Sequence, residues 1–338
     1  MKAMEPTSIA IVGTTLWGTT LSLLLANQNH KVKLIARTSE EADNLKSKRR
    51  HLNRLPEYEF PNSLQVTSDW EEGLADAQMI LFAVPCNSMR GNAQRASAAM
   101  VGNPIVISAS KGLEKDTSKR MSIVLTEELG IENQMLCVLS GPNLAREIVK
   151  GLPTSTVIAS SSIDTSLNVQ SVFNTSMFRV YTNNDVIGTE IAGALKNVIA
   201  IGAGICDGMK LGDNAKAGFI NRGMAEMTRL GVACGANPST FAGNAGLGDL
   251  LATCYSTQSR NYRIGIALAE GRTSDDAIAS LGGEIAEGVL TANSATALAQ
   301  KLMIDTPIIE MTNQVLNGSV SPQNALKELM SRSPKSEN

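Results

Sequence analysis

Short apolar runs alternate with helical patterns along the first half of the chain. Six of these runs predict strands, each followed by a segment with helical spacing: 8–13, 31–36, 64–67, 78–84, 104–110 and 134–140. Strands that are continuously rich in Val, Ile and Leu are typical of a parallel sheet covered on both faces by helices. Two further apolar runs, 154–160 and 177–182, are expected to complete this sheet.

The pattern changes at Asn184. The segment "NDVIGTEIAGALKNVIAIGAGICDGM" keeps a helical period throughout, and no convincing strand follows it. The remainder is helix rich in Ala, Gly and Leu, and it ends in the polar tail "SRSPKSEN". We therefore predict an α/β fold with a doubly wound, Rossmann-like, mostly parallel sheet in residues 1–185. An all-helical domain is expected over 186–330 and a disordered tail over 331–338.

Local signals predict where some helices begin. Asp69 and Thr117 have short polar side chains that can accept a hydrogen bond from a helix N-terminus, so both are expected N-caps. Pro142 is expected at the first position of another helix, where a missing N–H group breaks no hydrogen bond.

Residues 9–20, "IAIVGTTLWGTT", carry the clearest motif of the first half. A predicted strand ends at Gly13 and leads directly into a helix containing Gly18, close to the G-x-G-x-x-G fingerprint of dinucleotide-binding sheets. In that fingerprint, free N–H groups at the helix N-terminus bind the pyrophosphate. The turn therefore predicts a dinucleotide site, although two glycines in such a turn also occur in α/β proteins that bind no dinucleotide.

Thr15 stands where the fingerprint has its middle glycine. That glycine lets the backbone approach the pyrophosphate, so the branched Cβ of Thr15 should crowd a phosphate or force a different turn. Its hydroxyl could also donate a hydrogen bond to the phosphate. We expect dinucleotide binding that is retained but weakened.

The end of the second predicted strand, "LIARTSE", bears on cofactor choice. NAD-selective sites usually carry Asp or Glu at this place to bind the ribose 2′-hydroxyl, whereas this chain has Arg37. An arginine can stack on adenine and neutralise a 2′-phosphate, which favours tolerance of NADPH without excluding NADH. The alternative is an exposed arginine at a strand end with no role in cofactor binding.

Composition narrows the function classes. The chain has 338 residues, 43% of them hydrophobic, and a formal net charge of −2. No domain-sized basic surface is evident, so nucleic-acid binding is not expected, and the basic cluster at 45–54 is interpreted as a solvated helix face. Five singly scattered cysteines without a C-x-x-C pair fit reduced thiols and predict no metal site.

The same sequence predicts a cytoplasmic protein without an integral membrane segment. The N-terminus lacks a secretory pattern, and the most apolar later stretch, 197–205, is shorter than the roughly 20 residues that span a bilayer.

The long helix predicted in the second half carries one lysine on a face of small residues. At a period of 3.6, that face contains Gly193, Lys196, Asn197, Ala200 and Gly204. Small neighbours let a backbone or a ligand come close to the lysine. Burial lowers the pKa of a lysine toward the range where it exchanges a proton at neutral pH. The chain's two histidines, His30 and His51, both lie in the N-terminal region, so histidine is a poor candidate for a general base. A solvated surface lysine is the alternative.

Three other stretches offer polar groups. Asp249 follows a Gly-x-Gly turn in "NAGLGDLLATC", and "TQSRNYR" contributes a set suited to an anion such as phosphate: Ser259, Arg260 and Asn261. Lys111 comes directly after a predicted strand, so it is expected at the carboxyl edge of the sheet, where ligands bind in doubly wound folds. A helix N-terminus with a surface arginine would explain the stretch "TQSRNYR" equally well.

Eight blocks of sequence occur in a characteristic order: "VGTTLWGTTLSLLLA", "ASKGLE", "LSGPNLAREI", "GLPTSTVIAS", "FRVYTNNDVIGTEIAGALKNVIAIGAGICDGM", "NAKAGFINRGMAEMTRLG", "AGLGDLLATC" and "SRNYRIG". They closely resemble the bacterial-type NAD(P)-dependent sn-glycerol-3-phosphate dehydrogenases, over roughly residues 7–330. The resemblance implies a homodimer that interconverts dihydroxyacetone phosphate and sn-glycerol 3-phosphate by hydride transfer with NAD(P)H. It also implies a supply of glycerol 3-phosphate for glycerophospholipids.

Carried over position by position, the resemblance implies roles for individual residues. Lys196 would be the general acid/base, with Asn197 and Asp249 assisting its placement. The substrate site would be lined by Lys111, Gly141, Asn143, Ser259, Arg260 and Asn261. With the glycine turn, cofactor contacts would come from Gly13, Thr15, Leu16, Trp17, Gly18, Arg37, Lys111, Ala145, Arg260, Ile285 and Glu287. Asn143 departs from the family, which has Ser or Thr there, but its amide can still donate a hydrogen bond.

Other functions remain open at this stage. A related two-domain reductase could act on a 3-hydroxy acid or on a different 2-oxo phosphate. A non-catalytic NAD(P) sensor could have lost turnover when Thr15 arose, although a decayed site need not keep Lys196, Asp249 and Arg260. An α/β protein without any dinucleotide is the last alternative.

Overall fold

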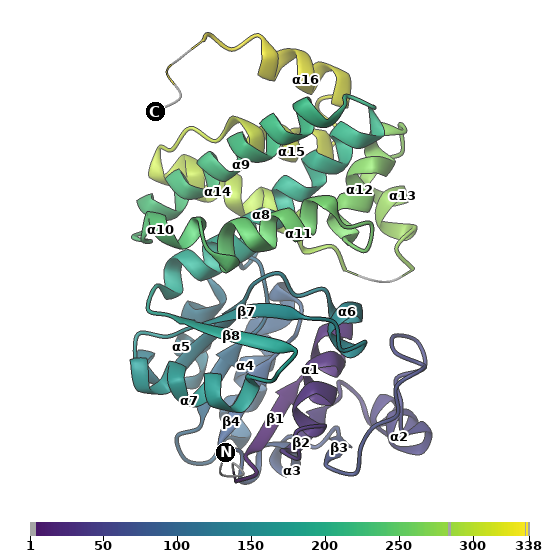
Figure 1. Ribbon diagram of the computed structural model, residues 1–338, viewed down its shortest axis with the longest axis vertical. Helices are drawn as coiled ribbons and strands as arrows, with labels where there is room; N and C mark the ends of the chain where they lie inside the picture. Colours follow the sequence, from purple (N-terminus) through teal and green to yellow (C-terminus); the bar gives the residue numbers. More distant parts are fainter. Residues whose placement is uncertain (1–4, 283–284, 335, 337–338) are drawn as a thin grey trace.

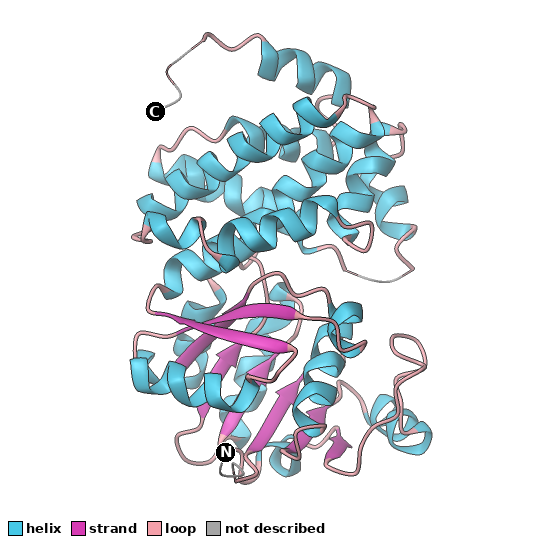
Figure 2. Ribbon diagram, viewed as in Figure 1, coloured by secondary structure: helices cyan, strands magenta, loops and turns pink. Residues whose placement is uncertain are grey.

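A computed structural model describes residues 5–282, 285–334 and 336. Figure 1 shows a layer of strands and helices in the first half of the chain, joined to a body of helices in the second half. Figure 2 shows that, within the described residues, every strand belongs to the first half.

The first half is built on one eight-stranded sheet. Its strands are β1 (Ser8–Val12), β2 (Lys31–Ile35), β3 (Leu64–Thr67), β4 (Met79–Phe82), β5 (Ile105–Ser108), β6 (Leu136–Ser140), β7 (Thr154–Ala159) and β8 (Phe178–Asn183). They lie in the order β3-β2-β1-β4-β5-β6-β7-β8, and each neighbouring pair is parallel except β6 with β7. The predicted mostly parallel, doubly wound sheet is confirmed.

Helices cover both faces of this sheet. They are α1 (Leu16–Ala26), α2 (Ser39–Lys48), α3 (Trp70–Leu74), α4 (Met89–Ala99), α5 (Met121–Leu129), α6 (Ala145–Val149) and α7 (Ile163–Phe173). Because successive strand residues point to opposite faces, Ile9 and Ile11 enter one apolar core while Ala10 and Val12 enter the other. Burial on both faces explains why the strands are continuously apolar.

The second half packs around one long helix, α8 (Val186–Gly208). Its partners are α9 (Asp213–Ala233), α10 (Pro238–Phe241), α11 (Asp249–Tyr255), α12 (Arg260–Ala269), α13 (Ser274–Ala279), α14 (Glu287–Leu302), α15 (Pro307–Leu316) and α16 (Pro322–Met330). Figure 1 shows α8 surrounded by several of them. By length and a mean hydropathy of 1.4, α8 could cross a membrane, yet 89% of its most apolar window is buried inside the protein. Such burial is that of a core helix.

Two glycines let α12 lie directly against α8. A Cβ on Gly204 would fall 2.1 Å from the carbonyl oxygen of Tyr262, and one on Gly265 would fall 1.9 Å from that of Ile201. The two backbones therefore touch, which explains the small-residue face predicted for α8. This contact fixes α12, which begins at Arg260, relative to the helix that carries Lys196.

One of the three predicted helix starts is confirmed. Asp69 caps α3 by accepting a hydrogen bond from Glu72 N at 3.0 Å. The prediction for Thr117 is wrong, because its hydroxyl bonds Glu114 within a turn and α5 begins only after Arg120. The prediction for Pro142 is also wrong, since the chain stays irregular until Ala145.

The tail is partly described. Arg332 pairs with Asp305 at 2.9 Å on the surface, and residues 335, 337 and 338 lie outside the described residues. The predicted disorder of 331–338 therefore stays a prediction.

Candidate active site

The glycine turn lies at the carboxyl edge of the sheet. Val12 pairs with Ile35 and with Phe82, so β1, β2 and β4 end side by side. Gly13 has a φ of +112°, and a Cβ there would fall 2.8 Å from Val84 Cγ1. A Cβ on Gly18 would fall 2.0 Å from the carbonyl oxygen of Gly13. Both positions therefore need glycine, as the dinucleotide fingerprint requires.

Thr15 has a structural role that the sequence did not predict. Its φ of −62° and ψ of 165° are an ordinary extended conformation, so the turn needs no glycine there. Its hydroxyl accepts a hydrogen bond from Gly18 N at 3.0 Å, which caps α1, and donates one to the carbonyl oxygen of Ala83 at 2.7 Å. Because a hydroxyl has one proton, the expected donation to a phosphate is not made in this arrangement.

The crowding predicted at Thr15 can be tested by replacement. Thr15→Gly removes the branched Cβ and should tighten NADH binding, while the helix cap loses only about a few tenths of a kcal/mol because glycine is accepted at N-caps. Thr15→Ser, which keeps the hydroxyl and removes the methyl group, is the matched control. The measurement is the dissociation constant for NADH by fluorescence titration, and an unchanged or weaker affinity of Thr15→Gly would rule out crowding.

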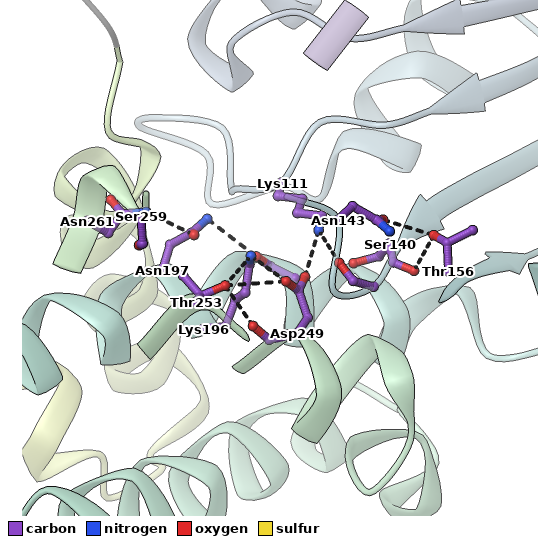
Figure 3. Close-up of polar contacts among 12 residues, drawn as sticks. Lys111, Ser140, Asn143, Thr156, Lys196, Asn197, Asp249, Thr253, Ser259 and Asn261 are labelled. Atoms are coloured by element: carbon purple, nitrogen blue, oxygen red, sulfur yellow. Dashed lines mark hydrogen bonds and ion pairs between the residues drawn. The ribbon is translucent and has the colours of Figure 1, made fainter. Parts of the chain in front are cut away.

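A buried carboxylate holds two lysines together (Figure 3). Asp249, only 1% exposed, accepts a hydrogen bond from Lys196 Nζ on Oδ1 and from Lys111 Nζ on Oδ2, each at 2.6 Å. Lys111 follows β5, Lys196 lies on α8 and Asp249 begins α11, so this cluster joins the sheet to the helical half. Lys111 also donates to the carbonyl oxygen of Gly141, after β6, at 2.9 Å.

The cluster shifts the pKa of Lys111. Burial lowers the pKa of Lys111 to about 8, and the neighbouring Asp249 carboxylate offsets part of that shift. Lys111 therefore changes charge close to neutral pH. The burial that the sequence predicts for Lys196 is confirmed, since this residue is 7% exposed.

A small residue on α8 lets the cluster form. A Cβ on Gly193 would fall 2.8 Å from Ser140 Oγ and 3.6 Å from Lys111 Cγ. One turn further on, Lys196 projects toward Asp249. The close approach of α8 to the ends of β5 and β6 is what brings the two lysines to one carboxylate.

Thr253 belongs to this cluster and was missed in the sequence. Lys196 Nζ donates to Thr253 Oγ1 at 2.8 Å, and that hydroxyl donates to the backbone oxygen of Asp249 at 2.6 Å. Its position was readable, because a residue four places after Asp249 in a helix lies on the same face. Thr253 fixes the Lys196 ammonium from a second side.

The predicted residues on α12 form a second polar group. Asn261 Nδ2 donates to Asn197 Oδ1 at 2.9 Å, and Gly288 N donates to Asn261 Oδ1 at 3.0 Å. Ser259 caps α12 by accepting from Tyr262 N. Asn197, one residue after Lys196, is thus held by Asn261 of α12, which is itself held by the backbone of α14.

Asn143 is tied to the neighbouring strand. Its Nδ2 donates to the carbonyl oxygen of Ser155 at 3.3 Å, and its Oδ1 accepts from Thr156 Oγ1 at 2.9 Å. An amide nitrogen has two protons, so one remains for a ligand. These bonds hold the loop after Gly141, whose φ is +149°, along β7 and delay the start of α6.

Most of the remaining expected cofactor residues open a helix or follow a strand. Leu16 and Trp17 open α1, Arg37 is exposed just after β2, Ala145 opens α6, Arg260 opens α12, and Ile285 is exposed before α14. Glu287 Oε1 accepts from Cys86 N at 3.3 Å, beyond the end of β4. Glu287 Oε2 and Trp17 Nε1 are buried without a hydrogen-bond partner among the described residues. Burial raises the pKa of Glu287 to about 7.

These observations fit a dinucleotide. The turn offers two positions where no side chain fits, at the N-terminus of a helix. Buried polar atoms are normally hydrogen-bonded, so Trp17 Nε1 and Glu287 Oε2 are candidates to bond a dinucleotide at this site.

Comparisons with known proteins agree with this geometry. Sequence profiles match residues 8–166 to the N-terminus and residues 185–327 to the C-terminus of NAD-dependent glycerol-3-phosphate dehydrogenase. A glycerol-3-phosphate dehydrogenase (NAD(P)+) of Dehalococcoides mccartyi is 47% identical over 95% of this chain and 90% of its own length. One of Enterococcus faecalis is 43% identical over 98% of this chain and 97% of its own length.

A solved structure shows the same architecture. The glycerol-3-phosphate dehydrogenase of Coxiella burnetii is 37% identical, with a TM-score of 0.92, and the match covers 97% of this chain and 99% of that one. Sequence, topology and site thus lead to one assignment. The chain belongs to the NAD(P)-dependent glycerol-3-phosphate dehydrogenase family.

Proposed function

We propose that this protein reduces dihydroxyacetone phosphate to sn-glycerol 3-phosphate, and catalyses the reverse oxidation, with NAD(P)H as the hydride carrier. The observation that carries this proposal is the Asp249 carboxylate, which holds Lys196 and Lys111 at the carboxyl edge of the sheet. Family membership supplies the substrate class, because the relatives are named for glycerol 3-phosphate.

Reduction of a ketone needs a hydride at carbon and a proton at oxygen. The bound nicotinamide would supply the hydride, and Lys196 Nζ would donate the proton to the carbonyl oxygen. Asp249 and Thr253 each contact this Nζ, so they fix its direction. In the oxidation direction, the same nitrogen accepts the proton of the secondary hydroxyl.

The phosphate supplies the binding energy that positions the carbonyl. We assign it to Lys111 and Arg260, with Gly141, Asn143, Ser259 and Asn261 completing the substrate site. Cationic side chains suit a phosphate dianion, and binding of this remote group holds the reacting carbon in place. Asn197, held by Asn261, supports the reacting end.

Further features of the proposal concern the whole protein. We infer a cytoplasmic homodimer that supplies glycerol 3-phosphate for glycerophospholipids. We also place the boundary between the cofactor domain (1–185) and the substrate domain (186–330) in the short link between β8 and α8.

The shifted pKa of Lys111 predicts a pH effect on substrate binding. The ammonium is charged below its pKa of about 8 and neutral above it, so the KM for dihydroxyacetone phosphate should rise as pH increases through that value. The measurement is the pH dependence of KM at saturating NADH. Lys111→Arg keeps its charge over this range, so its KM should stay flat, whatever its absolute value. A KM for the unmodified protein that is constant from neutral pH to well above 8 would contradict the assignment.

A panel of substrates distinguishes this proposal from its alternatives, a related two-domain reductase and a non-catalytic NAD(P) sensor. Reduction of NAD+ should be fast with sn-glycerol 3-phosphate and slow with its enantiomer, with glycerol and with 3-hydroxybutyrate. Faster turnover of the 3-hydroxy acid would instead favour a related reductase. Tight binding of NADH without turnover of any of them would favour a sensor.

A further inference from the structure

Glu41 places a carboxylate between the glycine turn and the end of β2. Its Oε1 accepts a hydrogen bond from Thr14 Oγ1 at 2.6 Å, and its Oε2 accepts one from Arg37 N at 3.1 Å. Thr14 directly follows Gly13, and Arg37 lies just past the end of β2. Since β1 and β2 are neighbours that end in register, this carboxylate bridges the two segments at the carboxyl edge.

This is the place where dinucleotide sites read the adenosine ribose. An acidic side chain at the end of the second strand binds the ribose 2′-hydroxyl and repels the 2′-phosphate of NADP. The chain has no acid at the strand end itself. Glu41 enters instead from the first turn of α2, two residues beyond Ser39, and reaches back to the strand.

The carboxylate is held but still has acceptor capacity. Each of its oxygens accepts one protein hydrogen bond, and a carboxylate oxygen can accept two. Thr14 is itself fixed from the other side, because its carbonyl oxygen lies 3.1 Å from His51 Nε2. Glu41 is half-buried, so its charge is screened less than that of its exposed neighbour Glu40.

We propose that Glu41 is a specificity-determining residue that makes this protein favour NADH over NADPH. Its carboxylate accepts the ribose 2′-hydroxyl of NADH and opposes the 2′-phosphate of NADPH. Arg37, at the same edge, gives the phosphate a compensating cation, so NADPH is disfavoured rather than excluded. The inference rests on the dinucleotide site of the proposed function, but it does not depend on the substrate or on Lys196.

The test is cofactor binding, measured without turnover. Dissociation constants for NADH and NADPH are obtained by fluorescence titration for the unmodified protein, Glu41→Gln and Glu40→Gln. Glutamine keeps the size and an acceptor oxygen while removing the charge. We expect the unmodified protein to bind NADH more tightly, and Glu41→Gln to shift the ratio of the two constants toward NADPH by about tenfold, as for removal of one close like charge. Glu40→Gln removes the same charge from the adjacent exposed position and should change the ratio by less than about twofold.

Two further variants separate charge from architecture. Thr14→Val removes the hydrogen bond to Glu41 but keeps the carboxylate, so it should leave the preference for NADH in place. Arg37→Ala should weaken NADPH binding more than NADH binding, because only NADPH loses the cation that faces its 2′-phosphate. A Glu41→Gln shift no larger than that of Glu40→Gln, or an unmodified protein that prefers NADPH, would overturn the inference. If neither the unmodified protein nor any variant binds either cofactor, although thermal unfolding shows that all are folded, the proposed function itself would be contradicted.

Discussion

Replacing Lys196 with alanine is expected to lower kcat for reduction of dihydroxyacetone phosphate by about 10³-fold, the range typical of a lost general acid. The variant should still bind NADH, because the hydrogen bonds of Lys196 are to Asp249 and Thr253 and the glycine turn is untouched. The measurement pairs steady-state turnover with a fluorescence titration of NADH.

Lys210→Ala is the matched control for this variant. Lys210 is exposed, just beyond the end of the same helix, so its loss should leave both kcat and NADH affinity close to those of the unmodified protein. Near-normal turnover of Lys196→Ala would show that Lys196 does not donate the proton. A loss of NADH binding in that variant would show a structural effect instead.

Asp249→Asn is expected to have the second largest effect. Among the described residues, the substitution removes the one negative charge that pairs with Lys111 and Lys196, whose ammonium groups each lie 2.6 Å from a carboxylate oxygen. Breaking a buried ion pair in this way costs about 3–5 kcal/mol, so the variant should be clearly less stable to urea. For the folded fraction of Asp249→Asn, kcat/KM should fall by about 10²-fold or more because the carboxylate no longer orients Lys196.

The pH dependence of this variant gives a readout that instability alone would not produce. Burial lowers the pKa of Lys111 to about 8, and the Asp249 carboxylate limits that shift. Removing the carboxylate should therefore lower the pKa of Lys111 still more. The rise of KM with pH should then begin at a lower pH than in the unmodified protein. An unchanged pH profile would show that Asp249 does not control the charge of Lys111. The exposed Asp164→Asn serves as the control.

Periodicity and composition were enough to predict the fold. Continuous apolar strands predicted a parallel sheet, and each face of that sheet is buried by helices. The small-residue face of α8 was also readable. Gly204 explains it through a close contact with the backbone of α12, and Gly193 through close contacts with the side chains of Ser140 and Lys111. Helix starts were less predictable. Thr117 has the right side chain for an N-cap, but tertiary contacts keep its segment in a turn.

Most residues of the candidate site could be proposed from the sequence, but their contacts with one another could not. Lys111, Lys196 and Asp249 stand far apart in the sequence. The packing of α8 against the sheet and of α11 against α8 brings both lysines to the Asp249 carboxylate. The hydrogen bond from the Thr15 hydroxyl to Ala83 was also hidden, because Ala83 follows a different strand. The contacts of Glu41 could not be predicted for a similar reason, since its side chain reaches back from the first turn of α2 to the glycine turn.

The most direct test of the proposed function is the oxidation of NADH, followed by absorbance, with dihydroxyacetone phosphate and with dihydroxyacetone. We predict rapid oxidation with the phosphorylated ketone and a kcat/KM lower by about 10³-fold or more without the phosphate, because its binding positions the carbonyl. The same assay with NADPH should proceed more slowly. Equal rates with and without the phosphate, or no oxidation with dihydroxyacetone phosphate, would contradict the assignment of this site to glycerol 3-phosphate chemistry.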